Sequence, residues 1–280
     1  MNMTLQVTNI KKTGEIITQA DALLITAGAG MGVDSGLPDF RGDQGFWKAY
    51  PPMEKLGISF VEMANPQWFT RDPGLAWGFY GHRLHLYRET KPHEGFTLLH
   101  QAAVTKAGGY FVFTSNVDGQ FQKAGFDDLR IEECHGSLQH LQCVRGCSGS
   151  IWSADKVEVK IDMDTFRAHP PLPACPDCGG LARPNVLMFG DWGWVSDRTE
   201  AQGGRFACWL QEVIAKRHCI CVVEIGAGRA VPTVRITSEN VAGRLGGTLI
   251  RINPRDYGVP AGEHFSVPLD GLEGIRKIIK

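Results

Sequence analysis

The fold is decided by residues 28–42, GAGMGVDSGLPDFRG, which directly follow the apolar run ALLIT at residues 22–26. A short apolar run of this kind predicts a buried strand. Closely spaced glycines after a strand leave backbone N–H groups open to a phosphate, because no Cβ stands in the way. A dinucleotide-binding turn ordinarily continues into a helix, whereas here Asp39, Phe40 and Arg41 follow within a few residues. The stretch therefore predicts a site that does chemistry on a dinucleotide and does more than hold it.

Similar apolar runs recur along the chain, at residues 110–113, 129–131, 220–223 and 248–252. Because helix-like stretches separate many of them, they predict an α/β fold, a Rossmann-like parallel sheet with helices on both faces. In such sheets, ligands bind at the carboxyl ends of the strands. Glycine and polar motifs follow the runs and should therefore meet in one crevice. They are Gly28, Ala29 and Gly30; Ser115, Asn116 and Asp118; His135; Gly226 and Ala227; and Asn253.

Two segments interrupt this α/β alternation. Residues 43–104 are rich in aromatic residues and proline, and their helix-like stretch at 75–88 predicts a helical lid or insert. Residues 141–182 are short of strong strands and contain paired cysteines, so they predict a small separate module. The Rossmann-like domain would then comprise residues 1–42, 105–140 and 183–280.

Bulk composition is that of an ordinary soluble globular enzyme, with 43% hydrophobic and 21% charged residues among 280. A net charge of -1 gives no overall field that would attract nucleic acid or an anionic membrane. No apolar run approaches the roughly 18 residues that span a bilayer, and the N-terminus lacks a signal-peptide pattern. We therefore expect a cytoplasmic protein with no nucleic-acid or membrane partner, of unknown oligomeric state.

Four of the eight cysteines form two pairs, Cys143 with Cys147 and Cys175 with Cys178. Thiolates at this spacing suit a closed, tetrahedral, structural Zn²⁺ site. Two alternatives stay open, namely four free thiols or a site that no longer binds metal. A nucleic-acid-binding zinc ribbon is disfavoured, because the segment lacks a basic and aromatic surface. The other cysteines are predicted to be small core hydrophobes: Cys134, Cys208, Cys219 and Cys221.

Four ordered segments, spanning about residues 20–256, resemble the signatures of the sirtuin family of NAD-dependent protein deacylases. They are residues 28–41, TSNVDG at 114–119, the pair His135 and Gly136, and the paired cysteines followed by RPNV at 183–186 and FGD at 189–191. The resemblance implies a Rossmann-like fold, NAD as the cosubstrate and a structural zinc. It also implies an acylated-lysine protein or peptide as the partner.

The reaction that this resemblance implies starts with attack of the acyl-lysine carbonyl oxygen on the nicotinamide ribose. Nicotinamide leaves and an alkylimidate forms. His135 then acts as general base, which suits an imidazole with an ordinary pKa near 6.5. Asn116 would organise the ribose, and Asp118 would hold the nicotinamide carboxamide. The ribose 2′-oxygen attacks the imidate carbon, water completes the reaction, and the products are lysine, nicotinamide and an O-acyl-ADP-ribose.

The implied catalytic residues are thus His135, Asn116 and Asp118. Phe40 would shield the ribose, Arg41 would hold phosphate or ribose oxygens, and Asp39 would shape the turn. The full set expected to bind NAD is Gly28, Ala29, Gly30, Asp39, Phe40, Arg41, Ser115, Asn116, Asp118, Gly226, Ala227 and Asn253.

Residues 186–191 are predicted to form an extended edge, and residues 226–232 a second one. The resemblance suggests that the acyl-lysine peptide adds a strand between them, through Val186, Met188, Phe189 and Gly190. Backbone hydrogen bonds would then give affinity with little sequence selectivity. The alternative for the first segment is a plain core strand.

Tyr80 and Arg83 are three residues apart and share a face of the predicted helix. The spacing resembles the Tyr-x-x-Arg pair of the sirtuin subgroup that removes succinyl and malonyl groups. A phenol and a guanidinium suit the distal carboxylate of such an acyl group. The alternative is an aromatic core residue beside a surface arginine.

The sequence departs from the family pattern at Ser115, where Gln is usual, and at residues 226–228, where Gly-Thr-Ser is usual. These changes remove polar groups from the expected NAD pocket. They keep open a sirtuin-like ADP-ribosyltransferase or NAD glycohydrolase. Retention of His135 favours deacylation, because that base acts after the imidate forms. A non-catalytic NAD-sensing module is disfavoured by the complete set of catalytic residues.

Overall fold

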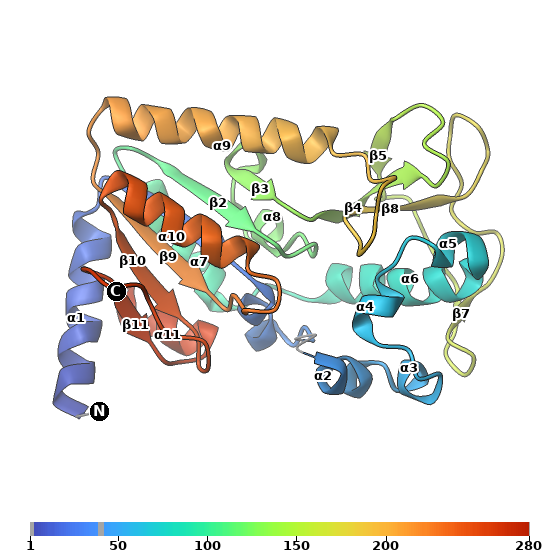
Figure 1. Cartoon of the computed structure of the whole chain (residues 1–280), viewed down its shortest axis with the longest axis horizontal. Coiled ribbons are helices and arrows are strands. Elements are labelled where there is room, and N and C mark those ends of the chain that lie inside the picture. The colour runs from blue at the N-terminus through green and yellow to red at the C-terminus, as the bar shows by residue number, and fades with distance from the viewer. Residues whose placement is uncertain (1–2, 39–41, 280) are drawn as a thin grey trace.

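The computed structural model describes residues 3–38 and 42–279, and its centre is a six-stranded parallel sheet (Figure 1). The strand order is β11-β10-β9-β1-β2-β3, as expected for a Rossmann-like α/β fold. The strands are β1 (Ala22–Ala27), β2 (Tyr110–Thr114), β3 (Ile131–Glu133), β9 (Ile220–Ile225), β10 (Thr248–Ile252) and β11 (Phe265–Val267). The predicted strands and the predicted fold class are therefore confirmed in outline.

Both faces of this sheet are covered by helices, which explains why its strands are apolar throughout. Along β1, Leu23 and Ile25 pack into one core, whereas Ala22 and Leu24 pack into the core on the opposite face. The first core is shared with α1 (Met3–Gln19), α7 (Glu94–Val104) and α11 (Gly271–Ile278), and the second with α9 (Asp197–Ala215) and α10 (Thr233–Leu245).

Strands β2 and β3 follow on one side of β1, whereas the later strands β9, β10 and β11 follow on its other side. The order of the strands therefore reverses between β1 and β9, which lie side by side at the middle of the sheet. Ligand sites of open α/β sheets lie at such a switch point. The glycine turn after β1 and the turn after β9 meet there. Gly226 has φ +64°, and a Cβ on it would lie 2.4 Å from the carbonyl carbon of Gly30. Only glycine therefore lets the two turns approach this closely.

A second, smaller body of the protein combines the helices after the glycine turn with a three-stranded sheet. The helices are α2 (Gly42–Ala49), α3 (Pro51–Lys55), α4 (Phe60–Met63), α5 (Trp68–Arg71) and α6 (Pro73–Glu89). The sheet has the order β5 (Ile151–Ser153), β4 (Gly136–Cys143) and β8 (Ala182–Val186). One hydrophobic cluster joins both, and the Trp77 indole N–H donates to the Ala182 carbonyl at 2.9 Å. A hairpin of β6 (Ile161–Asp162) and β7 (Arg167–Ala168) packs against α6.

Several details differ from the sequence-based expectations. The strand expected at 129–131 begins only at Ile131, because residues Asp128–Arg130 form a 3-10 turn. The three-residue strand β11 was not expected, since it is too short to give a pattern. The prediction that Cys208 and Cys219 are core residues is wrong: both are exposed. Cys221 is buried, as predicted, whereas Cys134 is only half-buried and packs against the edge of the core.

The division of the chain into three parts stays a prediction. Strands β4 and β8 run across its expected boundaries at residues 140/141 and 182/183. Within residues 3–38 and 42–279, no helix is both long enough and apolar enough to cross a membrane.

Candidate active site

A cavity of about 760 Å³ opens at the carboxyl ends of β1, β2 and β9. It brings together most of the residues predicted from sequence. Those lining it are Gly28, Ala29, Tyr80, Arg83, Ser115, Asn116, Asp118, His135, Val186, Met188, Phe189, Gly190, Gly226 and Ala227. The predicted residues Asp39, Phe40 and Arg41 lie outside the described part of the chain.

Two predicted cofactor residues, Gly30 and Asn253, lie behind the cavity wall. The Gly30 N–H donates to the carbonyl of Gly226 at 3.1 Å and so joins the two glycine turns. Asn253 is buried, and its amide donates to the carbonyl of Ala227 at 2.9 Å. In this arrangement both residues shape the wall through backbone partners.

His135 reaches the cavity from the link between β3 and β4. The link is fixed on both sides, because the Cys134 N–H donates to the Thr114 carbonyl at 2.9 Å and the Leu187 N–H to the His135 carbonyl at 3.0 Å. Burial lowers the pKa of His135, and a hydrogen bond to the backbone of Ser115 partly opposes this. The imidazole is therefore neutral near pH 7 and able to accept a proton.

Asn116 and Asp118 follow β2 and face the same cavity. The Asn116 side-chain amide donates to the carbonyl of Gly28 at 3.1 Å, which ties this loop to the first glycine turn. Asp118 accepts the Gln120 N–H at 2.9 Å. Burial is the main reason that the pKa of Asp118 is raised to about 6. This carboxyl group therefore titrates just below neutral pH.

On the α6 side, the cavity is lined by Tyr80, Arg83 and Tyr87. Arg83 donates from Nε and Nη2 to the Tyr87 hydroxyl at 3.0 and 2.7 Å. The hydroxyl of Tyr80 is buried and has no described hydrogen-bond partner. Arg83 is only 6% exposed, so the alternative of a surface arginine is wrong. Tyr87 was missed, although its position four residues after Arg83 on one helix would have indicated it.

The segment after β8 forms the rim of the cavity. Its N–H groups are already engaged: Leu187 donates to His135, Phe189 to the Ala64 carbonyl at 2.9 Å, and Met188 to Asp191 at 3.3 Å. Asp191 is itself buried in an ion pair with Arg183. Hydrogen bonds within the protein therefore fix the conformation of this segment. The alternative of a plain core strand holds only as far as Val186, where β8 ends.

Glu133 is a further residue that the sequence did not reveal. It ends β3, two residues before His135, and three residues of α9 hold it. Arg198 pairs with its carboxylate at 2.5 Å, Thr199 donates to its carbonyl at 3.2 Å, and Gln202 accepts its N–H at 3.1 Å. The available signal was an acidic residue two positions before the predicted catalytic histidine.

The two cysteine pairs converge into one cluster, in which all four sulfurs lie within 4.8 Å of one another. The separations are 3.7 Å between Cys143 and Cys178 and 3.6 Å between Cys147 and Cys175. Tetrahedral zinc with Zn–S bonds of about 2.3 Å places its sulfurs about 3.8 Å apart. The cluster therefore fits a structural Zn²⁺.

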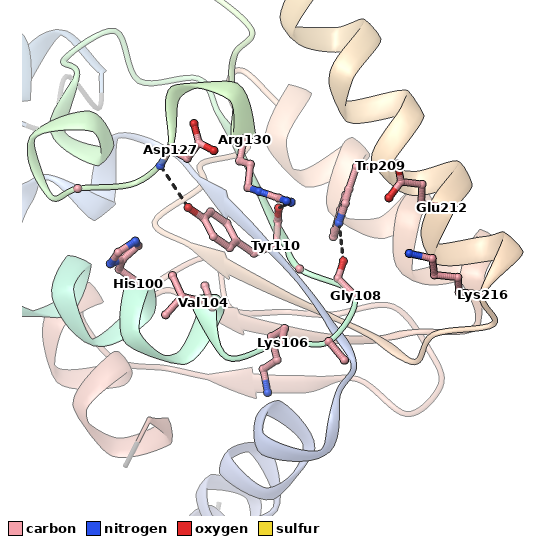
Figure 2. Close-up of a pocket in the computed structure, with 14 residues that line it drawn as sticks. His100, Val104, Lys106, Gly108, Tyr110, Asp127, Arg130, Trp209, Glu212 and Lys216 are labelled. Carbon is pink, nitrogen blue, oxygen red and sulfur yellow. Dashed lines mark hydrogen bonds between the residues drawn. The ribbon is translucent and has the colours of Figure 1, made fainter.

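A second cavity, of about 620 Å³, lies at the opposite end of the large sheet, where β2 begins (Figure 2). Its polar side chains hold the surrounding backbone. Trp209 donates to the Gly108 carbonyl at 2.9 Å, Arg130 donates to the Tyr110 carbonyl at 3.2 Å, and Lys106 donates to the Thr18 carbonyl at 3.1 Å. None of the predicted site residues that the structure describes lines it, so the first cavity is the candidate active site.

Comparison with known proteins identifies the family. The Sir2 family profile matches residues 28–200, more than half of the chain. The chain belongs to the Sir2 family. A curated NAD-dependent protein deacylase of Aeropyrum pernix is 30% identical over 246 residues, covering 87% of this chain and 85% of that protein. An NAD-dependent protein deacetylase of Saccharolobus solfataricus is 33% identical over 280 residues, covering 96% and 98%.

Solved structures of Sir2 proteins agree with this assignment. A Sir2 homologue in complex with NAD has a TM-score of 0.68 and 27% identity, covering 96% of this chain and 91% of that one. A variant Sir2 homologue in complex with ADP-ribose also has a TM-score of 0.68, with 26% identity, covering 100% and 95%. The predicted family resemblance is confirmed, whereas the Tyr-x-x-Arg subgroup stays a prediction.

Proposed function

We propose that this NAD-dependent protein lysine deacylase prefers short acyl groups that end in a carboxylate, such as succinyl and malonyl. NAD-dependent deacylation is the activity for which its curated relatives are named, and it is the activity of this Sir2-family chain. The observation that carries the acyl preference is the pair of Arg83 and Tyr80 on the cavity wall.

The chemistry of that wall matches a carboxylate. Arg83 brings a buried positive charge, and its hydrogen bonds to Tyr87 hold the guanidinium in place. The Tyr80 hydroxyl is a buried donor with no described partner, and such a group is costly to leave unsatisfied. An acyl carboxylate would accept hydrogen bonds from both side chains, whereas an acetyl methyl group would leave them as they are.

The remaining cavity residues would serve NAD and the transfer itself. The turns at Gly28 and Gly226 would admit the phosphates, since little side chain stands over their backbone. Asn116 would orient the ribose, and ionised Asp118 would accept a hydrogen bond from the nicotinamide carboxamide. Neutral His135 would take a proton from a ribose hydroxyl.

A second candidate function is ADP-ribosyl transfer or NAD hydrolysis. Ala227 and Gly228 line the cavity without the hydroxyl groups usual there, and Ser115 replaces the usual Gln. Fewer contacts to NAD would let water or another side chain reach the ribose. This candidate cleaves nicotinamide in the same way and differs only in the acceptor.

Mass spectrometry of the products separates these activities. Matched acetyl-, succinyl- and longer-acyl-lysine peptides are incubated with NAD and the wild-type enzyme, with His135→Ala as the control. We expect O-acyl-ADP-ribose, with the succinyl peptide consumed fastest and almost no product from His135→Ala. ADP-ribosylated protein, or free ADP-ribose with the acyl group retained on lysine, would instead support the second candidate.

The acyl preference is tested with Arg83→Met and Tyr80→Phe. Hydrogen bonds to a charged group contribute about 1.5–3 kcal/mol, so kcat/KM for desuccinylation should fall about 10- to 100-fold in Arg83→Met. Deacetylation should change little. The assay is run near pH 8, because Arg83 lowers the pKa of Asp118 and its loss must not leave that carboxyl protonated. Equal losses of both activities would refute the preference.

A further inference from the structure

We propose that the apolar rim of the cavity selects substrates with an apolar residue beside the acyl-lysine, and that Trp192 is the selecting side chain. The rim consists of Leu187, Phe189, Trp192 and Val231, all of which line the cavity. This inference rests on the proposed deacylase function and adds the sequence class of the protein substrate.

The rim is unusual because large apolar side chains are gathered there in contact with solvent. Trp192 is 100% exposed, and Leu187, Phe189 and Val231 are exposed as well. Single exposed apolar residues are common, but a group of them at the mouth of a cavity marks a binding surface. Tryptophan is also enriched among the residues that dominate binding energies.

The backbone of this edge offers few free N–H donors to a substrate, and it turns at Phe189 and Gly190 just after β8 ends. The N–H groups of Leu187, Met188 and Phe189 already donate within the protein. An added peptide strand cannot take those three donors without breaking existing hydrogen bonds. With fewer backbone donors, recognition at this edge depends more on side chains, which makes it more selective for substrate sequence.

Two ion pairs of the described residues lie near the rim, and their paired charges do not favour a charged flanking residue. The buried Asp191 carboxylate is bound to Arg183, and Arg229 lies 3.3 Å from Asp256. A lysine or glutamate beside the acyl-lysine would meet apolar surface and lose part of its hydration. An aliphatic or aromatic residue would instead bury apolar area against Trp192.

The loop that carries Trp192 is anchored immediately before it. Asp191 accepts the N–H groups of Met188 and Gly193 at 3.3 and 3.2 Å, in addition to its ion pair with Arg183. Gln142 also donates to the Gly193 carbonyl at 2.7 Å. The backbone on both sides of Trp192 is therefore fixed, which lowers the entropic cost of binding through this side chain.

The rim is continuous with the cavity that holds the predicted catalytic and acyl-binding residues. A polypeptide whose acyl-lysine enters that cavity must pass over these side chains. This continuity identifies the occupant as the chain that flanks the modified lysine.

The test uses labelled acyl-lysine peptides that differ only at the residues next to the lysine, with Phe or Leu in one set and Lys, Glu or Gly in the other. Binding is measured by fluorescence anisotropy, and turnover by mass spectrometry with NAD. We expect wild-type enzyme to favour the Phe and Leu peptides about tenfold, or ~1.4 kcal/mol. Trp192→Ala should lose most of this preference through KM, with kcat unchanged, and Trp192→Phe should retain part of it.

Leu129→Ala serves as the matched control, because Leu129 is also an exposed apolar residue but does not line the cavity. It should keep the wild-type preference. The inference is overturned if wild-type enzyme binds all peptides alike, or if Trp192→Ala keeps the preference. If the preference appears in binding but no peptide loses its acyl group, the rim proposal stands and the deacylase function fails.

Discussion

The pKa of Asp118 is set by several groups that surround this carboxyl group in the candidate site. Burial is the largest cause of its raised pKa, and the Glu133 charge raises it further, whereas the Gln120 N–H and Arg83 lower it. The carboxyl group also acts on the pKa values of its neighbours Tyr87 and Lys123. Two residues outside the predicted site, Glu133 and Gln120, thus help to set its ionisation.

The proposed contact between Asp118 and the nicotinamide carboxamide predicts a pH dependence. A pKa of about 6 means that the accepting carboxylate is lost as the pH falls through that value. We therefore expect kcat/KM for NAD to decline on the acid side of pH 6. In Glu133→Gln, a negative charge beside Asp118 disappears, so the pKa of Asp118 falls. The decline of kcat/KM at acid pH (the acid limb of the pH profile) should then move to lower pH.

Glu132→Gln is the control for that measurement. It removes the neighbouring carboxyl group, which is not among the main causes of the shifted pKa of Asp118. Its acid limb should match the wild type. An acid limb that stays in place in Glu133→Gln would mean that Glu133 acts only as a structural anchor for α9.

At the scale of elements, the site depends on two turns that touch. The turns after β1 and β9 are close because Gly226 and Gly28 have no side chains: a Cβ on Gly226 would overlap the Gly30 backbone, and a Cβ on Gly28 would lie 2.8 Å from the Cα of Ala227. The strands themselves bring these turns together, since β1 and β9 pair along their whole lengths. A change in either turn should therefore act on NAD binding as well as on stability.

Gly226→Ala and Gly246→Ala test this contact. Their φ angles are +64° and +63°, but a Cβ on Gly246 meets nothing within 4 Å. Both should lose about 1–2 kcal/mol of unfolding free energy from the left-handed backbone, and Gly226→Ala should lose more. Only Gly226→Ala should weaken NAD binding in calorimetry, and similar affinities in the two variants would contradict this account.

At the scale of the whole molecule, the cysteine cluster is linked to the acyl site through shared packing. Cys143 ends β4, which pairs with β8, and β8 leads directly to the rim. The same hydrophobic cluster includes α6, the helix that carries Tyr80 and Arg83. The zinc cluster, the acyl wall and the rim therefore belong to one body, whereas the glycine turns belong to the large sheet.

Removal of zinc should accordingly affect deacylation more than NAD binding. Structural zinc contributes on the order of 10 kcal/mol, so a chelator or Cys175→Ser should lower the melting temperature strongly and abolish deacylation. NAD binding should decline less, because the large sheet has its own two cores. Cys208→Ser, at an exposed cysteine outside the cluster, should retain its metal, as measured by elemental analysis, and its activity.

The sequence by itself determined the parallel sheet, the glycine turns, the cysteine cluster and most of the cavity-lining residues. These features are carried by local patterns: apolar runs, glycines after strands, paired cysteines and short motifs. It failed where the signal was short, as for β11, or where burial depended on distant packing, as for Cys208 and Cys219.

Only the tertiary structure decided which groups of the site are buried, which are hydrogen-bonded within the protein and which are charged. Arg83 became a buried cation because α6 packs against the small sheet. The backbone N–H groups of the rim donate to the carbonyls of His135 and Ala64, which are far away in the chain. Glu133 likewise pairs with a residue of the distant helix α9. Solvent access and hydrogen-bond partners are properties of that three-dimensional packing, so no local pattern contains them.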